Sequence, residues 1–185
     1  MAILLTRGEP ANALAAFLRQ RLGENGMARL KGRLSREENE ILAGKSLASD
    51  RISVDVLNRL TRLTAEVLEQ PVFEFGVSAG RHAAETATRT VYKFIIGLLS
   101  PASVFRAMPA MWNRVFNGGR VTVDFGDGQG TIRVDDIPVD RVFCGRLTGW
   151  FGFIGEKAAR EVTTTHRPCR ALGGEMCVWN FTWKV

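Results

Sequence analysis

The apolar residues of the chain change their spacing once, at Asn117-Gly118-Gly119. Before this point they recur at intervals of three and four, which is typical of helices that bury one face. After it they alternate with polar residues, as at Val121, Val123 and Phe125, which is typical of a strand with one buried face. Helices that come first and strands that come later predict an α+β fold rather than alternating strand–helix units.

Helix signals divide the first part of the chain into short segments. Ser35 and Glu38 have the spacing of a capping box. Ser53 precedes a strongly periodic run that ends before Pro71, and Ser100-Pro101 is a typical helix start. Small residues on the predicted buried face after Pro71 allow another backbone to approach closely. The expected helices are 11–22, 36–42, 53–70, 78–98 and 100–117.

The second part of the chain predicts an antiparallel meander. Gly126 to Gly130 forms a turn between two strands, and Gly173-Gly174 forms a turn between the last two. Between these hairpins we expect a short strand at 139–143 and a helix at 147–158. We therefore expect a single domain, 1–185. In it, the N-terminal helices of 1–117 pack on a four- to five-stranded antiparallel sheet in 118–185, with one helix inserted in the meander.

Length and composition fit one globular core. The chain has 185 residues, of which 45% are hydrophobic, enough for one substantial core. Its longest apolar stretch, Phe94–Leu99, is too short to span a membrane, and the run Ala2–Leu5 is too short for a signal peptide. We therefore expect a soluble, cytoplasmic protein. The net charge is +6, but Lys and Arg are scattered among acidic residues, so we expect no nucleic-acid partner.

All three cysteines and one of the two histidines lie between Cys144 and the C-terminus. Two residues separate His166 from Cys169, a spacing that allows both side chains to bind the same metal ion. Cys144, His166, Cys169 and Cys177 would together supply the four nitrogen and sulfur ligands of a tetrahedral zinc site. Two other interpretations remain open. The thiols can serve as small buried apolar side chains, or Cys169 and Cys177 can form a cross-strand disulfide.

The sequence contains no catalytic constellation. His82 and His166 are the only imidazoles that could act as a base for a Ser or Cys nucleophile. It also has no nucleophile elbow, phosphate-binding loop or dinucleotide-binding fingerprint. We therefore expect a binding protein rather than an enzyme.

Three groups of residues match a known family: Val77-Ser78-Ala79-Gly80-Arg81, Ser100-Pro101 with Trp112, and Cys144, Cys169 and Cys177 with Gly173-Gly174-Glu175. Through them the C-terminal half resembles the four-vinyl reductase domain. That domain occurs in a bacteriochlorophyll-synthesis protein and in sensory modules of aromatic-responsive bacterial transcription activators. In the activators it resembles a zinc-bearing fold with three Cys ligands and one Glu, and His166 stands here at the position of that Glu. The resemblance therefore implies zinc as the cofactor, in a closed structural site.

The wider fold resembles that of heme–nitric-oxide-binding domains and of subunits of the TRAPP transport tether. The Tyr, Ser and Arg cluster that marks heme binding is missing, because Tyr92 is the only tyrosine and Lys93-Phe94 follow it. We therefore do not expect heme. The whole chain is also similar to an uncharacterised family of bacterial paralogues, which implies no function.

One function is preferred over two alternatives. We expect a sensory module for a small apolar or aromatic ligand, because aromatic and Met-rich helices can line an apolar pocket. The same stripes are also typical of an ordinary core. By analogy with related sensor domains we expect a homodimer that acts through a separate effector protein. The alternatives are a non-catalytic scaffold or dimerisation subunit and, third, a tetrapyrrole reductase. The candidate pocket residues are His82, Phe105, Met108, Met111, Trp112, Phe116, Trp150 and Phe151, with His82 and Trp112 as polar anchors for a phenolic or acyl group.

Overall fold

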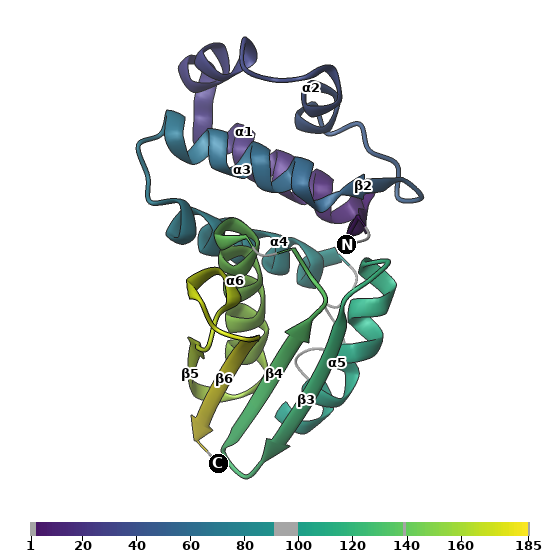
Figure 1. Cartoon of the computed structure of the whole chain (residues 1–185), viewed down its shortest axis with the longest axis vertical. Helices are drawn as coiled ribbons and strands as arrows, with labels where there is room; N and C mark the ends of the chain where they lie inside the picture. The colour runs from purple at the N-terminus through teal and green to yellow at the C-terminus, as the bar shows by residue number, and fades with distance from the viewer. Residues whose placement is uncertain (1–2, 91–99, 139, 185) are drawn as a thin grey trace.

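The computed structural model describes residues 3–90, 100–138 and 140–184. The first part of the chain is helical, with one short antiparallel pair of strands, β1 and β2 (Figure 1). Its elements are β1 (Leu5–Arg7), α1 (Gly8–Lys31), α2 (Arg36–Leu42), β2 (Arg51–Ser53), α3 (Val54–Val67) and α4 (Val72–Thr90). The second part contains α5 (Pro101–Val115), β3 (Arg120–Gly126), β4 (Gln129–Asp135), α6 (Arg141–Ala158), β5 (Arg160–His166) and β6 (Cys177–Lys184).

Local capping explains where several helices begin. The Ser35 hydroxyl accepts a hydrogen bond from the Glu38 backbone N–H, and the Glu38 carboxylate accepts one from the Ser35 backbone N–H, which confirms the predicted capping box. Ser53 caps α3 and Ser100 caps α5, also as expected. Helix α1 does not end near Gly23. It changes direction there, at a φ of 59°, and continues to Lys31.

The sheet confirms the predicted α+β architecture. Strands β3, β4, β6 and β5 lie side by side in this order, all antiparallel, and α6 is inserted between β4 and β5. The predicted strand at 139–143 is wrong. Asp140 instead caps α6, since its carboxylate accepts a hydrogen bond of 2.7 Å from the Val142 N–H, and this starts a helix at Arg141. Part of the predicted helix 78–98 lies outside the described residues, including Val91, Phe94, Ile95 and Leu98 on its expected buried face.

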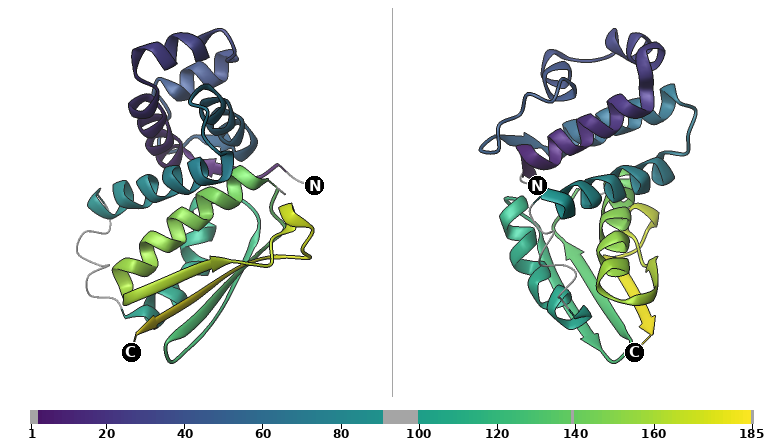
Figure 2. Two further views of the ribbon diagram at one scale, coloured as in Figure 1. Left: turned by 90° about the vertical axis from the view of Figure 1, so that its left-hand side faces the viewer. Right: turned by 180° about the vertical axis from the view of Figure 1, so that it is seen from behind.

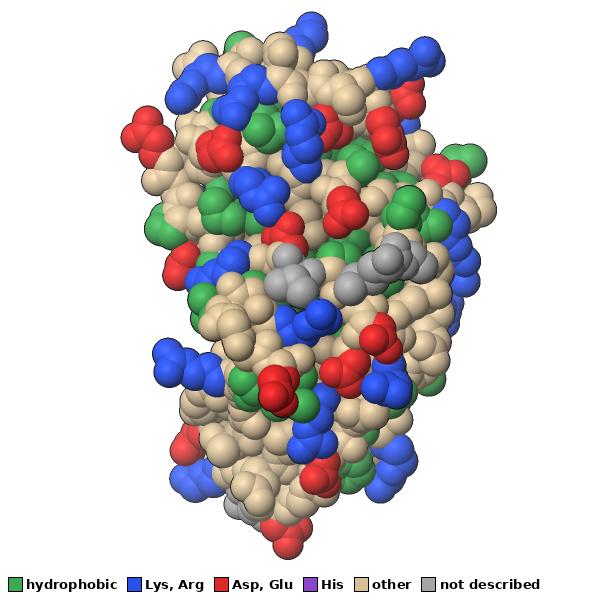
Figure 3. Space-filling model, viewed as in Figure 1, with side chains coloured by type: hydrophobic (Ala, Val, Ile, Leu, Met, Phe, Trp, Pro, Cys, Tyr) green, Lys and Arg blue, Asp and Glu red, His purple; other side chains and the backbone are tan. Residues whose placement is uncertain are grey.

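Helices α5 and α6 cover one face of the sheet, and the other face is turned outward (Figures 1 and 2). Exposed threonines occur on the outward side, at Thr122, Thr163, Thr165 and Thr182. On the molecular face seen in Figure 3, Lys and Arg are interspersed with Asp and Glu. This face therefore carries mixed charge. No helix in the described ranges is long and apolar enough to cross a membrane.

Helix α4 lies between the helical part and the sheet part and crosses α6 (Figure 2). The crossing is made by glycines, because a β-carbon at Gly80 would come within 1.8 Å of the Arg146 carbonyl oxygen. Arg81 of α4 also donates two hydrogen bonds, of 2.8 and 2.7 Å, to the Glu156 carboxylate of α6. Separate hydrophobic clusters lie on the two sides of this crossing, one in the helical part and one against the sheet. The α4–α6 pair therefore connects the two parts.

Candidate functional site

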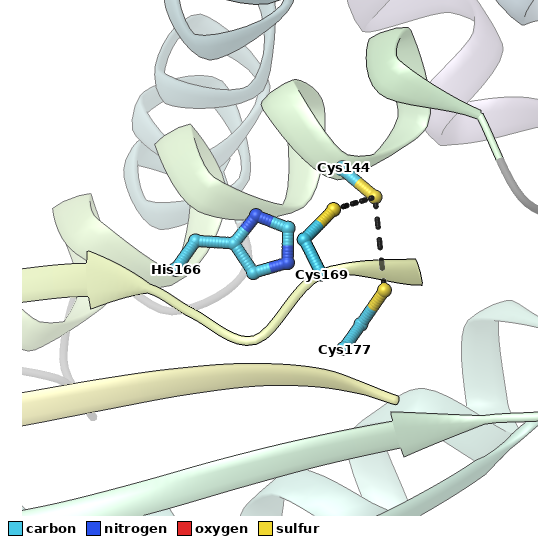
Figure 4. Close-up of side chains that lie close together, drawn as sticks. All are labelled: Cys144, His166, Cys169 and Cys177. Atoms are coloured by element: carbon cyan, nitrogen blue, oxygen red, sulfur yellow. Dashed lines mark hydrogen bonds between the residues drawn. The ribbon is translucent and has the colours of Figure 1, made fainter. Parts of the chain in front are cut away.

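Four side chains with ligand atoms meet beside the first turn of α6 (Figure 4). Cys144 belongs to that turn, His166 ends β5, Cys177 begins β6, and Cys169 lies in the loop between the two strands. One ligand atom from each side chain lies within 4.8 Å of all the others. The structure therefore brings together the four residues predicted from the sequence as a possible metal site.

The loop between β5 and β6 turns Cys169 inward. The Val178 N–H donates a 3.0 Å hydrogen bond to the Pro168 carbonyl, and the Gly174 N–H donates one of 3.0 Å to the Cys169 carbonyl. These bonds fold the loop back on itself and leave Cys169 only 3% exposed. Cys169 is thus a loop residue and does not face Cys177 across two paired strands.

All three cysteines are buried, free thiols. The Cys144 Sγ is central, at 3.9 Å from the Cys177 Sγ and 3.8 Å from the Cys169 Sγ. The sequence left a Cys169–Cys177 disulfide open, but all three thiols are free, and the Cys144 sulfur contacts both of the others.

The charge balance of the cluster favours one thiolate over several. The hydrogen bond from the Cys144 thiol lowers the pKa of Cys177, and His166 lowers it further. The same contact with Cys177, together with burial, raises the pKa of Cys144, because a second negative sulfur beside the first is unfavourable. The Nε2 atom of His166 is buried without a hydrogen-bond partner. The imidazole edge that carries it points toward the cysteines (Figure 4).

A second feature is an apolar cavity between the sheet and helices α5 and α6. Its volume is about 20 Å³, and it is partly open to solvent. Phe105 is one of its lining residues, and its ring packs edge-on against Phe181 at 5.2 Å and stacks on Trp183 at 5.6 Å. The cavity is lined by Pro101, Val104, Phe105, Met108, Ile132, Phe151, Ile154, Gly155, Ala158, Ala159, Val162, Phe181 and Trp183.

The cavity includes only some of the candidate pocket residues. Phe105, Met108 and Phe151 line it. The other candidates lie elsewhere: Trp112 packs on Phe116 with ring centroids 4.3 Å apart, and His82 packs on Phe17 in the helical part with centroids 5.4 Å apart. The remaining two, Met111 and Trp150, are not among the lining residues. The Trp112 indole N–H donates a 2.8 Å hydrogen bond to the Gly118 carbonyl, so it is not free to anchor a ligand.

Sequence reasoning missed the strand side of the cavity. Ile132, Val162, Phe181 and Trp183 come from β4, β5 and β6. The sequence does indicate the contribution of the last strand, because Phe181 and Trp183 alternate with polar residues and so share its buried face. Of the apolar face of α5, only Val104, Phe105 and Met108 line the cavity, whereas Trp112 is buried in the core beside it.

No family model and no curated protein match the sequence, but solved structures match the fold. An H-NOX protein from S. oneidensis in the Fe(II)NO ligation state is 15% identical, with a TM-score of 0.66, over 97% of this chain and 99% of that chain. An Fe(II) unliganded H-NOX mutant from K. algicida is 7% identical, with a TM-score of 0.73, over 97% of each chain. A structure described as modulating heme redox potential through porphyrin distortion is 11% identical, with a TM-score of 0.71, over 97% and 95%.

These matches show that the chain has the fold of H-NOX proteins, as expected from the resemblance to heme–nitric-oxide-binding domains. The resemblance to the four-vinyl reductase domain and to TRAPP subunits stays a prediction. Zinc as the cofactor is a wrong prediction by this comparison, because the proteins that share the fold are described with heme and Fe(II). The physical reason is that thiolate and imidazole ligands bind several transition metals, so ligand type alone does not select one.

Proposed function

We propose that the chain is a sensory module that binds a small, neutral, apolar molecule in the cavity between α5, α6 and the sheet. The observation that carries this proposal is the lining, which comes from α5, α6 and three strands and contains no charged side chain. Burying a charged ligand there would leave its charge unpaired, which is strongly unfavourable. The H-NOX fold supports a sensory role, because its solved members include proteins described with bound NO and CO.

The size of the cavity narrows the ligand class. Its volume of about 20 Å³ is far below the range of about 300–1,000 Å³ that is typical of pockets for drug-sized molecules, and it is close to the space that one water-sized molecule needs. Apolar cavities stay free of water and can take up an apolar gas such as xenon. The ligand class is therefore an apolar gas.

Heme, which the fold implies, does not fit the described part of this cavity. The axial ligands of heme iron are His, Cys, Met or Tyr, and Met108 is the only such residue in the lining. The lining also contains no Lys or Arg to pair with the two heme carboxylates. His82 lies against Phe17 and His166 lies in the thiol cluster, while Tyr92 is outside the described residues. We therefore base the ligand proposal on the apolar lining and not on heme.

The ligand proposal can be tested by NMR of methionine methyl groups labelled with ¹³C, with xenon as the probe. Met108 lines the cavity, whereas Met27 lies in a separate groove of the helical part. We expect a saturable shift of the Met108 methyl signal and none of Met27. Ala158→Leu fills the cavity from α6 and should abolish the shift, while Ala28→Leu in the separate groove should preserve it. A Met108 signal that does not respond, or responds equally in Ala158→Leu, would overturn the proposal.

We also infer that Cys144, His166, Cys169 and Cys177 bind a metal ion. Three sulfurs bound to one tetrahedral ion at about 2.3 Å lie about 3.8 Å apart, and the Cys144 Sγ lies 3.8 and 3.9 Å from the other two sulfurs. The buried, unpartnered Nε2 of His166 is a further reason, because buried polar atoms normally have a partner. A cation would also stabilise the thiolate form of Cys144, whose pKa is raised by its hydrogen bond with Cys177 and by burial.

Elemental analysis of protein purified without a metal-binding tag tests this second proposal and identifies the metal. We expect one ion per chain, lost in Cys169→Ser and in His166→Ala. His82→Ala is the matched control. His82 packs on Phe17 in the helical part and does not belong to the cluster, so its replacement should leave the metal content unchanged. Metal-free protein whose three thiols titrate freely, and which does not bind added Co²⁺, would contradict the metal site.

The homodimer and the separate effector protein stay predictions. Sedimentation of the purified chain tests the first. A scaffold or dimerisation subunit becomes the better description if the chain is dimeric and the Met108 signal does not respond to xenon.

A further inference from the structure

The imidazole of His166 packs parallel to the rings of two aromatic side chains. Its ring lies 4.2 Å from that of Trp179, with the planes 2° apart, and 6.5 Å from that of Phe73, with the planes 9° apart. Trp179 is the direct partner of His166 on the neighbouring strand β6, whereas Phe73 comes from α4. We call Phe73 and Trp179 the aromatic clamp.

This arrangement differs from the usual support of a metal-binding histidine. Such a histidine normally donates a hydrogen bond from its second ring nitrogen to an oxygen, which fixes the orientation of the ring. Among the residues that the structure describes, no oxygen accepts a hydrogen bond from His166. Its ring instead packs against the rings of Phe73 and Trp179. The ring orientation, with Nε2 toward the thiols, therefore depends on the aromatic clamp.

Both members of the clamp are themselves fixed beside Cys144. The Trp179 indole N–H donates a 2.8 Å hydrogen bond to the Thr148 hydroxyl, which in turn donates one of 2.8 Å to the Cys144 carbonyl. Phe73 is brought in by the close approach of α4 to α6. A β-carbon at Gly145 would lie only 2.5 Å from the Phe73 carbonyl oxygen, so a glycine next to Cys144 is what allows this approach.

We propose that Phe73 and Trp179 are positioning residues that hold His166 in the orientation needed for metal binding, and that α4 of the helical part acts on the metal site through Phe73. This inference rests on the proposed metal site. Phe73 belongs to the helical part. A displacement of α4 relative to α6 would therefore move Phe73 away from His166 and loosen the orientation of this one ligand. The thiols would stay in place.

The test uses the full chain loaded with Co²⁺, whose absorption bands report the ligand set directly. We expect Phe73→Leu to lower Co²⁺ affinity about 10- to 100-fold, as is typical when the residue that orients a metal ligand is lost. We also expect it to speed transfer of the ion to a chelator and to weaken the bands that depend on the imidazole. Phe73→Tyr keeps a ring at this position and should restore affinity to within about 3-fold of the natural chain.

Phe75→Leu is the matched control, since Phe75 lies two residues further along α4, is 1% exposed and packs in the core of the helical part. It should lower the thermal midpoint but leave Co²⁺ affinity and spectrum unchanged. The proposal is overturned if Phe73→Leu binds Co²⁺ like the natural chain, or if Phe75→Leu weakens binding equally. If Phe73→Leu does not fold without metal, the rate of Co²⁺ transfer from the loaded protein gives the same comparison. A natural chain that binds no Co²⁺ would overturn the metal site itself, which is a different result.

Discussion

Gly80 of α4 and Arg146 of α6 touch through their backbones, since a β-carbon at Gly80 would lie 1.8 Å from the Arg146 carbonyl oxygen. A second contact has the opposite arrangement, with the glycine on α6 and the carbonyl on α4: a β-carbon at Gly149 would lie 1.9 Å from the Val77 carbonyl oxygen. Backbone atoms cannot move aside as a flexible side chain can. The distance between α4 and α6 is therefore set by these glycines, and with it the position of Phe73 over His166.

Replacing either crossing glycine with alanine should destabilise the protein. For Gly80→Ala and Gly149→Ala we expect a loss of about 1–3 kcal/mol in the free energy of unfolding, which is typical of overpacking. Gly152→Ala is the control on the same helix, because its β-carbon would meet only the Thr164 hydroxyl, at 3.9 Å. It should stabilise the protein by up to about 1 kcal/mol, because alanine is the better helix former. Urea unfolding measures all three, and equal stabilities would contradict the tight crossing.

Asp140 is expected to stabilise the helix that carries Cys144. Its carboxylate accepts hydrogen bonds from the backbone N–H groups of Val142, at 2.7 Å, and Phe143, at 3.4 Å, and forms a 2.8 Å ion pair with Arg62. Asp140→Ala removes both functions and should cost about 1 kcal/mol or more, as for other lost helix caps. Asp140→Asn keeps a capping oxygen and loses only the half-exposed ion pair, so its cost should stay below about 1 kcal/mol. Thermal unfolding distinguishes the two, and equal losses would show that the cap contributes little.

Much of the fold is readable from local sequence signals. The capping box at Ser35, the cap at Ser53 and the turn at Gly126–Gly130 all depend on residues close together in the chain, and the structure confirms each. The strand predicted at 139–143 failed because its apolar residues fit either a strand or one face of a helix. Only the cap at Asp140 decides between them.

The Cys–His cluster shows what sequence spacing can and cannot give. Its residues were identified correctly as neighbours, since their ligand atoms lie within 4.8 Å of one another. The placement of Cys169 in a loop, and of Cys144 between the other two sulfurs, depends on tertiary contacts of α6 with the sheet. The same limit applies to the metal, because ligand types do not determine which ion is bound. It also applies to the cavity: the alternation in the last strand shows which of its side chains are buried, but the register of β4, β5 and β6 shows which residues they lie beside.

Glu38 should make stability depend on pH in the acid range. It is buried and bonded to the half-exposed Arg59. Burial raises the pKa of its carboxyl, but hydrogen bonds from Arg59 and Ser35 outweigh burial and hold the pKa below its ordinary value of 4.5. A lowered pKa in the folded state means that the stabilisation is complete above about pH 4.5 and is lost as the pH falls through the folded value.

Glu38→Gln removes this charge and keeps an oxygen that can accept the capping bond from Ser35. At pH 7 we expect a loss on the order of 1 kcal/mol, less than for a fully buried charged pair because Arg59 is partly screened by solvent. The difference from the natural chain should shrink steadily as the pH falls below 4.5. Glu37→Gln is the control with the same change of charge at an exposed neighbouring position, and it should change stability little at any pH. Urea unfolding between pH 3 and 7 measures both, and a Glu38→Gln difference that stays constant over this range would show that the carboxylate does not stabilise the fold through its charge.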